Sequence, residues 1–184
     1  ALRGIYGVRV EYPRMYRSNT DGQRLEDISH KFLEASINAT RSNSIARTAT
    51  FVFRDAEGLN FKTDWFMPCM VLNVNGIEVE FQQGIFQATV PSHSYSENGE
   101  TISAQASDLG ILFDEQLTYP YTVPAGSNYV ETVRVIANMY GITRLLIPPT
   151  SKVTPNEFTW NTGSTAWSVI NDLLQGINYL PGWF

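Results

Sequence analysis

The fold of this 184-residue chain is set by residues 70–81, MVLNVNGIEVEF, in which two apolar, strand-like runs flank an Asn-Gly pair. Both central residues of a type I′ turn need a positive φ angle, which Asn and Gly tolerate best. The stretch therefore predicts a β-hairpin that turns at Asn75-Gly76. Because successive side chains of a strand point to opposite faces, Glu78 and Glu80 share one face, opposite Ile77, Val79 and Phe81. We interpret the glutamate face as a solvated sheet surface.

Further strands are predicted on both sides of this hairpin. Runs rich in β-branched and aromatic residues, several of them alternating apolar with polar, cover residues 5–12, 33–39, 46–54, 84–90, 92–96 and 101–106. A second Asn-Gly pair, Asn98-Gly99, predicts a hairpin between the last two. Five to seven antiparallel strands at short spacing favour a barrel or a sandwich.

The pattern becomes helical after residue 107, and we find no internal repeat in the sequence. A short helix is predicted within residues 107–116, and two prolines make residues 119–126 a linker. A longer helix follows, capped by Asn128 with Glu131 and ended by Gly141. The last predicted helix begins after Ser164 and stops at Gly176.

These elements predict a mainly β protein with a helical insertion, of the α+β class. Residues 1–122 are expected to form an antiparallel β-barrel or sandwich. Residues 123–184 are expected to form a two-helix segment that leads into a further strand or domain.

Composition and charge restrict the function. Hydrophobic residues make up 43% of the chain and charged residues 17%, which is below the roughly 25% of an average protein. We expect a well-packed core and a surface that partners partly cover. The net charge is −5 and the basic residues are scattered, which argues against tight binding of nucleic acid. The chain has no apolar run near the ~20 residues needed to span a bilayer, so we expect no membrane insertion.

The residues that could carry chemistry do not form a recognisable site. Cys69 is the single cysteine, which excludes an internal disulfide and a thiolate zinc site, and its apolar neighbours predict a small buried side chain. Asp27 and His30 are three positions apart and would need a third ligand to hold a metal. The sequence has no Gly-x-Ser-x-Gly elbow that would supply a serine nucleophile for His93 to activate. We therefore predict no catalytic residue, no cofactor and no metal.

Two other classes of function stay open at this point. A carbohydrate-binding or host-attachment module could use Trp65, Trp160 or Trp183 as stacking platforms. A cell-wall hydrolase could use Glu78 or Asp114 as its catalytic acid, since the pairs Glu78/Glu80 and Asp114/Glu115 suggest glycoside hydrolysis. We regard both as weaker than a structural role.

The chain closes on residues 177–184, INYLPGWF, an unusually apolar and aromatic end. We interpret it as the start of a strand whose partners lie in the rest of a longer protein or in another subunit. Tyr179, Trp183 and Phe184 are therefore the candidate interface residues.

Several stretches, in their order along the chain, resemble the hub proteins of bacteriophage tail tips and baseplates. The stretches are LEDIS at 25–29, IARTATFVFRD at 45–55, QGIFQATVPS at 83–92, ISAQASD at 102–108, VPAGSNYV at 123–130, WN at 160–161, STAW at 164–167 and LLQGINY at 173–179. Together they cover most of the chain, and their shared order carries the resemblance.

The resemblance implies a tail-tube-like β-barrel with a helical insertion, located in the virion. It implies assembly as a homotrimer in which two barrels per subunit form a pseudo-sixfold ring. The expected neighbours are tail tube or distal tail proteins, the tape measure protein, and tip or fibre proteins, with DNA only in transit. This chain departs from the pattern because it has strands for one barrel, so it is either a fragment or forms a different ring.

Overall fold

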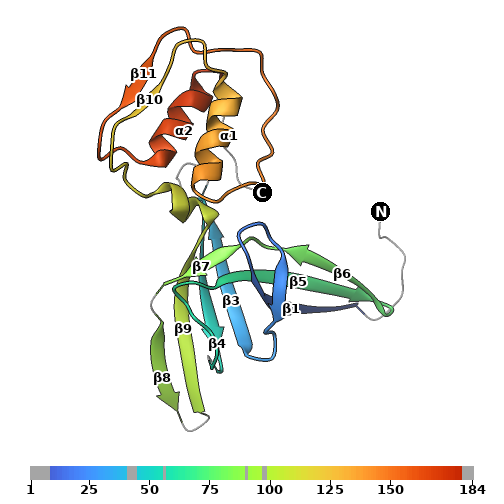
Figure 1. Ribbon diagram of the computed structural model, residues 1–184. Helices are drawn as coiled ribbons and strands as arrows, with labels where there is room; N and C mark the ends of the chain where they lie inside the picture. The colour runs from blue at the N-terminus through green and yellow to red at the C-terminus, as the bar shows by residue number, and fades with distance from the viewer. Residues whose placement is uncertain (1–8, 41–44, 56, 90, 97–98, 180–184) are drawn as a thin grey trace. The chain divides into compact units, whose positions relative to one another are not determined.

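A computed structural model of the chain describes residues 9–40, 45–55, 57–89, 91–96 and 99–179. The chain divides into two compact units. One comprises Ala1–Asn38 and Thr48–Asp108, and the other comprises Ala39–Arg47 and Leu109–Phe184. The first contains the large sheet, and the second contains the helices (Figure 1).

The first unit is a nine-stranded sheet with the order β2-β1-β5-β7-β9-β4-β3, in which β6 also pairs with β5 and β8 with β9. The strands are β1 (Arg9–Ser18), β2 (Arg24–Asp27), β3 (Phe32–Ala39), β4 (Arg47–Phe53), β5 (Trp65–Val74), β6 (Ile77–Gln82), β7 (Phe86–Ala88), β8 (Ser92–Ser96) and β9 (Gly99–Asp108). The mainly β, α+β prediction is confirmed. Within the described residues the order is open, with β2 and β3 at its two ends, so the sheet is not a closed barrel.

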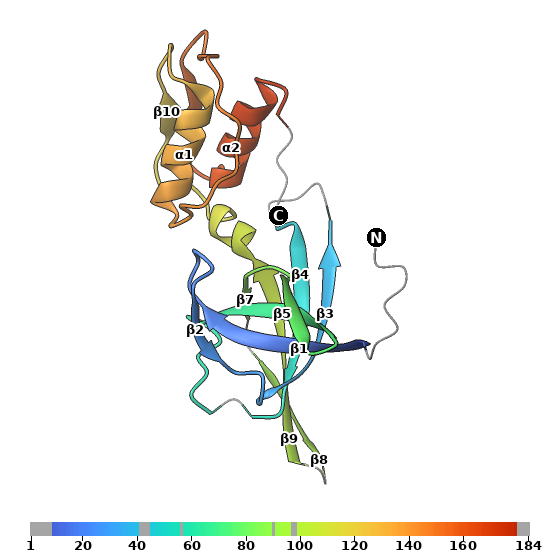
Figure 2. The same ribbon diagram turned by 90° about the vertical axis from the view of Figure 1, so that its right-hand side faces the viewer.

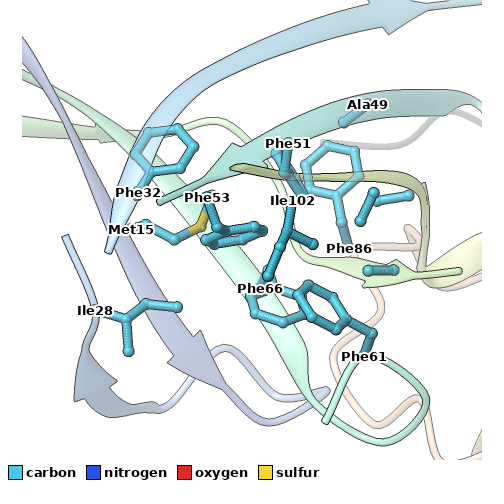
Figure 3. Close-up of a cluster of buried hydrophobic side chains, with 13 residues drawn as sticks. Met15, Ile28, Phe32, Ala49, Phe51, Phe53, Phe61, Phe66, Phe86 and Ile102 are labelled. Carbon is cyan, nitrogen blue, oxygen red and sulfur yellow. The ribbon is translucent and has the colours of Figure 1, made fainter. Parts of the chain in front are cut away.

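The sheet curls over one hydrophobic core, although its order is open. Met15 comes from β1 and Phe32 from β3, near opposite ends of the order, yet both belong to the same buried cluster (Figure 3). Aromatic rings fill its centre: the ring centroids of Phe51 and Phe86 lie 5.6 Å apart, edge to face, as do those of Phe53 and Phe61. Such edge-to-face pairs stabilise a core beyond the area that they bury.

The longest pairing in the unit joins β1 to β5, which lie side by side from Arg9 opposite Val74 to Ser18 opposite Trp65 (Figure 2). β5 continues through a tight turn into β6. Asn75 has φ 54° and Gly76 φ 85°, the two positive angles that the predicted type I′ turn requires.

The second predicted hairpin is right in its strands and wrong in its turn. Gly99 is the first residue of β9 and pairs with Ser96. It therefore cannot be a central residue of the turn, and Asn98 lies outside the described residues.

The second unit contains a 3-10 helix, two α-helices and a small two-stranded sheet. Its elements are η1 (Leu109–Phe113), β10 (Tyr121–Val123), α1 (Tyr129–Met139), β11 (Phe158–Trp160) and α2 (Ala166–Gln175). The side chain of Asn128 accepts a hydrogen bond from Glu131 N at 3.1 Å, which confirms the predicted cap of α1. Helix α2 begins one residue later than predicted, because Thr165 rather than Ser164 is its N-cap.

This unit contains a repeat that the sequence analysis missed. A strand, a turn with a positive-φ glycine, a capping residue and a helix occur twice at the same spacing. β10 starts at 121 and β11 at 158, the glycines are Gly126 and Gly163, and the caps are Asn128 and Thr165. The two strands pair antiparallel, with Thr122 opposite Thr159. α1 and α2 supply most of one hydrophobic cluster.

No helix of the described residues is long and apolar enough to cross a membrane.

Candidate assembly surface

The hairpin formed by β5 and β6 is the most distinctive surface feature of the first unit. β6 pairs with β5 from Ile77 opposite Val74 to Gln82 opposite Cys69, and no other strand of the described residues pairs with β6. One backbone edge of β6 is therefore open. The two faces of this hairpin have opposite character.

One face carries a network of ion pairs that ties β6 to β1 and β2. Arg14 Nη1 lies 2.5 Å from Glu80 Oε1, and its Nη2 lies 2.9 Å from Glu78 Oε2. Arg24 Nη2 lies 2.5 Å from Glu80 Oε2. The Glu80 side chain is only 17% exposed to solvent. The prediction of a solvated glutamate face is therefore wrong for Glu80, which is enclosed by its partners.

Two tyrosines complete this network. Tyr12 Oη donates to Glu78 Oε1, and Tyr16 Oη donates to Glu80 Oε1 over 2.8 Å. The guanidinium carbon of Arg24 lies 4.2 Å from the centre of the Tyr16 ring, in cation–π geometry. Glu80 thus accepts from two arginines and a tyrosine.

The network lowers the pKa of both carboxyl groups. Partial burial by itself would raise the pKa of Glu80, but hydrogen bonds from Arg14, Tyr16 and Arg24 outweigh it, and the pKa is lowered. The hydrogen bond from Tyr12 is the main cause of the lowered pKa of Glu78. Both groups are therefore ionised at neutral pH, and neither has the raised pKa of a catalytic acid.

Cys69 lies beneath this network and is buried, as predicted. Its pKa is raised, chiefly by burial, although Arg24 Nη2 lies 3.9 Å from its sulfur. A buried thiol with a raised pKa is a poor nucleophile.

The opposite face of the hairpin is apolar and exposed. Ile77, Val79 and Phe81 of β6 are 70%, 47% and 50% exposed. Their partners on β5 are Val74, Leu72 and Met70, which are apolar as well. Adjacent strand positions on the same face belong to Arg9 and Glu11 of β1, which form an ion pair with each other. We name Met70, Leu72, Val74, Ile77, Val79 and Phe81 the hairpin face.

The residues considered for metal binding and catalysis do not converge. Asp27 ends β2 and accepts from Ser29 N at 2.9 Å, while His30 lies exposed in the following turn rather than on a helix. His93 Nδ1 lies 2.5 Å from Glu100 Oε1 on the exposed β8–β9 hairpin. Among the described residues, no group of three or more potential ligands could hold a metal ion.

The remaining candidates are scattered over the two units. Trp65 begins β5, and Trp160 on β11 donates from Nε1 to Asp172 Oδ2 at 2.8 Å. Asp114 and Glu115 are exposed after η1. Of the predicted interface residues, Tyr179 packs partly buried against the helical cluster. Trp183 and Phe184 lie outside the described residues, together with the Trp183 stacking hypothesis.

No known protein-family profile and no curated protein matches the sequence. Solved structures do match, over 91% of the chain. They include a tail protein of Neisseria meningitidis MC58 (TM-score 0.56, 11% identity) and the 43 kDa tail protein of prophage MuSo2 from Shewanella oneidensis (TM-score 0.56, 13% identity). A third is a chain of the lidded Francisella PdpA–VgrG complex (TM-score 0.58, 8% identity).

The chain spans half the length or less of these proteins: 46%, 50% and 26%. The expected resemblance to phage tail proteins is therefore confirmed at the level of the fold. The described chain has the fold of part of a phage tail protein and of part of a chain in a VgrG complex.

Proposed function

We propose that this chain is a structural component of a phage tail tip or baseplate hub in the virion. It oligomerises, as a homotrimer, into a ring that joins the tail tube to the tip. The tape measure protein and then DNA pass through this ring, whose neighbours are tail tube or distal tail proteins and tip or fibre proteins. The observation that carries the proposal is the fold shared with two tail proteins over 91% of the chain.

Two properties of the chain support an assembly role. The hairpin face exposes large apolar side chains beside an open strand edge, and such surfaces are typical of protein interfaces. The net charge of −5 suits a passage for DNA, since acidic groups around a lumen repel phosphates.

The chain acts without catalysis in this proposal. The hydrogen bond from Tyr12 lowers the pKa of Glu78, and hydrogen bonds from arginines and a tyrosine lower the pKa of Glu80, so neither has the raised pKa that suits the proton donor of a hydrolase. Trp160 donates its indole N–H to Asp172 within the second unit.

We also propose that the two units are separate domains, a tube-like domain and a helical one. Because Tyr121–Val123 pairs with Phe158–Trp160, we move the boundary from residues 122 and 123 to residues 108 and 109.

The proposal is tested by mass measurement in solution together with electron microscopy. We expect a trimer and ring-shaped particles with a central hole, formed by the chain alone or with its tail neighbours. A chain that stays monomeric at high concentration, even when those neighbours are present, would contradict it.

A further inference from the structure

The first unit has four strands with an open edge, and they differ in chemistry. β2, β3, β6 and β8 each have one paired neighbour among the described residues. Strand β2 reads RLED, is short and is mostly charged, and β8 reads SHSYS and is polar. Charged and short edges such as β2 resist pairing with other chains. The polar edge of β8 offers no apolar stripe that pairing would bury. We therefore look to the other two edges for the assembly contact.

The other two edges carry apolar stripes. β6 reads IEVEFQ, with Ile77, Val79 and Phe81 on the hairpin face. β3 reads FLEASINA, and all of its residues except Phe32 and Ile37 are exposed. Neither strand contains proline or lysine, the residues that commonly protect an edge.

We propose that the open edge of β6 in one copy pairs with the open edge of β3 in a second copy of this chain. The proposal rests on the assembly function above and names the surfaces that would mediate it. The pairing is head to tail, because two different edges meet. A head-to-tail contact closes into a ring when its rotation permits.

The two strands match each other in an antiparallel register that places Val79 opposite Ile37. In this register Phe81 faces Ala35 and Ile77 faces Ala39, so apolar residues meet apolar residues. Cross-strand apolar pairs stabilise a sheet by contact on a shared face.

The polar residues of the same register also fit. Glu78 faces Asn38 and Glu80 faces Ser36, so each carboxylate meets an uncharged hydrogen-bonding group. The remaining pair is Gln82 with Glu34, an amide with a carboxylate. No two like charges stand opposite each other.

The alternative pairing of β6 with a second β6 is unfavourable. An antiparallel pair centred on Val79 would place Glu78 opposite Glu80 twice, and like charges directly opposite destabilise a sheet. The charge pattern therefore favours β3 as the partner of β6.

Disulfide trapping in the full chain tests the register. The double variant Phe81→Cys/Ala35→Cys places two exposed cysteines opposite each other across the contact, while Cys69 stays buried. Under mild oxidation we expect loss of the monomer band on a non-reducing gel and a ladder of covalent dimers and trimers that ends at the closed ring of three. The matched control Phe81→Cys/Tyr95→Cys, which moves one thiol to the polar edge β8, should stay monomeric on the gel.

The single variant Val79→Cys tests the alternative. A β6–β6 contact would place the two introduced thiols opposite each other and give a covalent dimer that stops at two chains, which would overturn the proposal. Absence of a ladder from the double variant would overturn it as well. If electron microscopy then still shows rings, the proposed function stands and only the β6–β3 contact is wrong; if it shows none, both fail.

Discussion

The guanidinium of Arg14 on β1 reaches across β5 to the carboxylate of Glu80 on β6, with 2.5 Å between Nη1 and Oε1. The outer strand of the hairpin is thus held by side chains as well as by its backbone ladder. An assembly edge that is fixed before it meets its partner loses less conformational entropy on binding.

This contact predicts a loss of stability in acid. The pKa of Glu80 is lowered in the folded chain, so its contribution is present above its ordinary pKa of 4.5 and is lost as the pH falls through the lowered value. We expect Glu80→Gln to cost about 1 to 2 kcal/mol at neutral pH. The stability of the Glu80→Gln variant should also decline less steeply in acid than that of the parent chain. Urea unfolding at a series of pH values measures both, with the exposed Glu157→Gln as control; parallel pH curves for Glu80→Gln and the parent would refute the prediction.

The turn of the same hairpin gives a second prediction. Gly76 has φ 85°, and a Cβ atom added there would meet no heavy atom within 4 Å, so a substitution costs backbone strain alone. Gly76→Val should lower the free energy of unfolding by about 1 kcal/mol or more, because a β-branched residue resists a positive φ. Gly76→Asn, which tolerates that angle, should cost less. Equal melting temperatures for the two variants would contradict this reasoning.

A third prediction concerns a buried threonine of the second unit. Thr154 Oγ1 donates to Pro124 O at 2.8 Å and accepts from Ser127 N at 3.1 Å, which secures the turn before α1. Thr154→Val keeps the shape and removes the hydroxyl that both of these backbone groups contact, so we expect a loss of about 1 to 3 kcal/mol. Thr154→Ser keeps the hydroxyl and should lose less. Thermal unfolding monitored by circular dichroism compares the two variants. A larger loss of stability in Thr154→Ser than in Thr154→Val would contradict the prediction.

A fourth prediction separates folding from assembly in the helical unit. Trp167 is half-buried against the cluster formed mainly by α1 and α2. Trp167→Ala should cost less than the roughly 3 to 5 kcal/mol typical of a fully buried Trp. It should leave the oligomer unchanged, since Trp167 packs against the hydrophobic cluster of its own unit. Light scattering at matched concentration checks this, and dissociation of the oligomer with a folded protomer would show that Trp167 faces a neighbour.

A fifth prediction tests the absence of chemistry. Asp27→Ala, His30→Ala and His93→Ala should leave assembly and infectivity intact, because these side chains are exposed and, among the described residues, belong to no group of metal ligands. Metal analysis of the purified chain should find less than one zinc, manganese or calcium ion per chain. Loss of infectivity in particles that assemble normally would point to a function for the altered residue.

Local chemistry made part of this structure predictable. The turn at Asn75-Gly76 and the cap at Asn128 depend on residues within four positions of each other, so both can be predicted from a short stretch of sequence. One missed detail is also local: the N-cap of α2 is Thr165 rather than Ser164, and these adjacent hydroxyl residues have similar capping ability.

The character of the two hairpin faces could not be predicted, because alternation does not tell which face is covered. The run IEVEFQ reads the same whether its apolar side is buried or exposed. The answer depends on Arg14 and Arg24, which are distant in the sequence and enclose Glu80. Likewise, the repeat in the helical unit escaped notice because the aligned segments 121–129 and 158–166 share little beyond a threonine, a glycine and a serine.

That repeat has a consequence for how the helical unit stays within one chain. Each strand–turn–helix half makes its main contacts with the other half, so a half from a second chain offers nearly equivalent contacts. The connection through residues 140–157 keeps the two halves of one chain at high effective concentration, which favours pairing within that chain. Shortening this connection below the span between the halves would reverse the preference and yield a dimer by exchange of halves. The length of a segment without regular structure thus determines whether this unit is formed by one chain or by two chains that exchange halves.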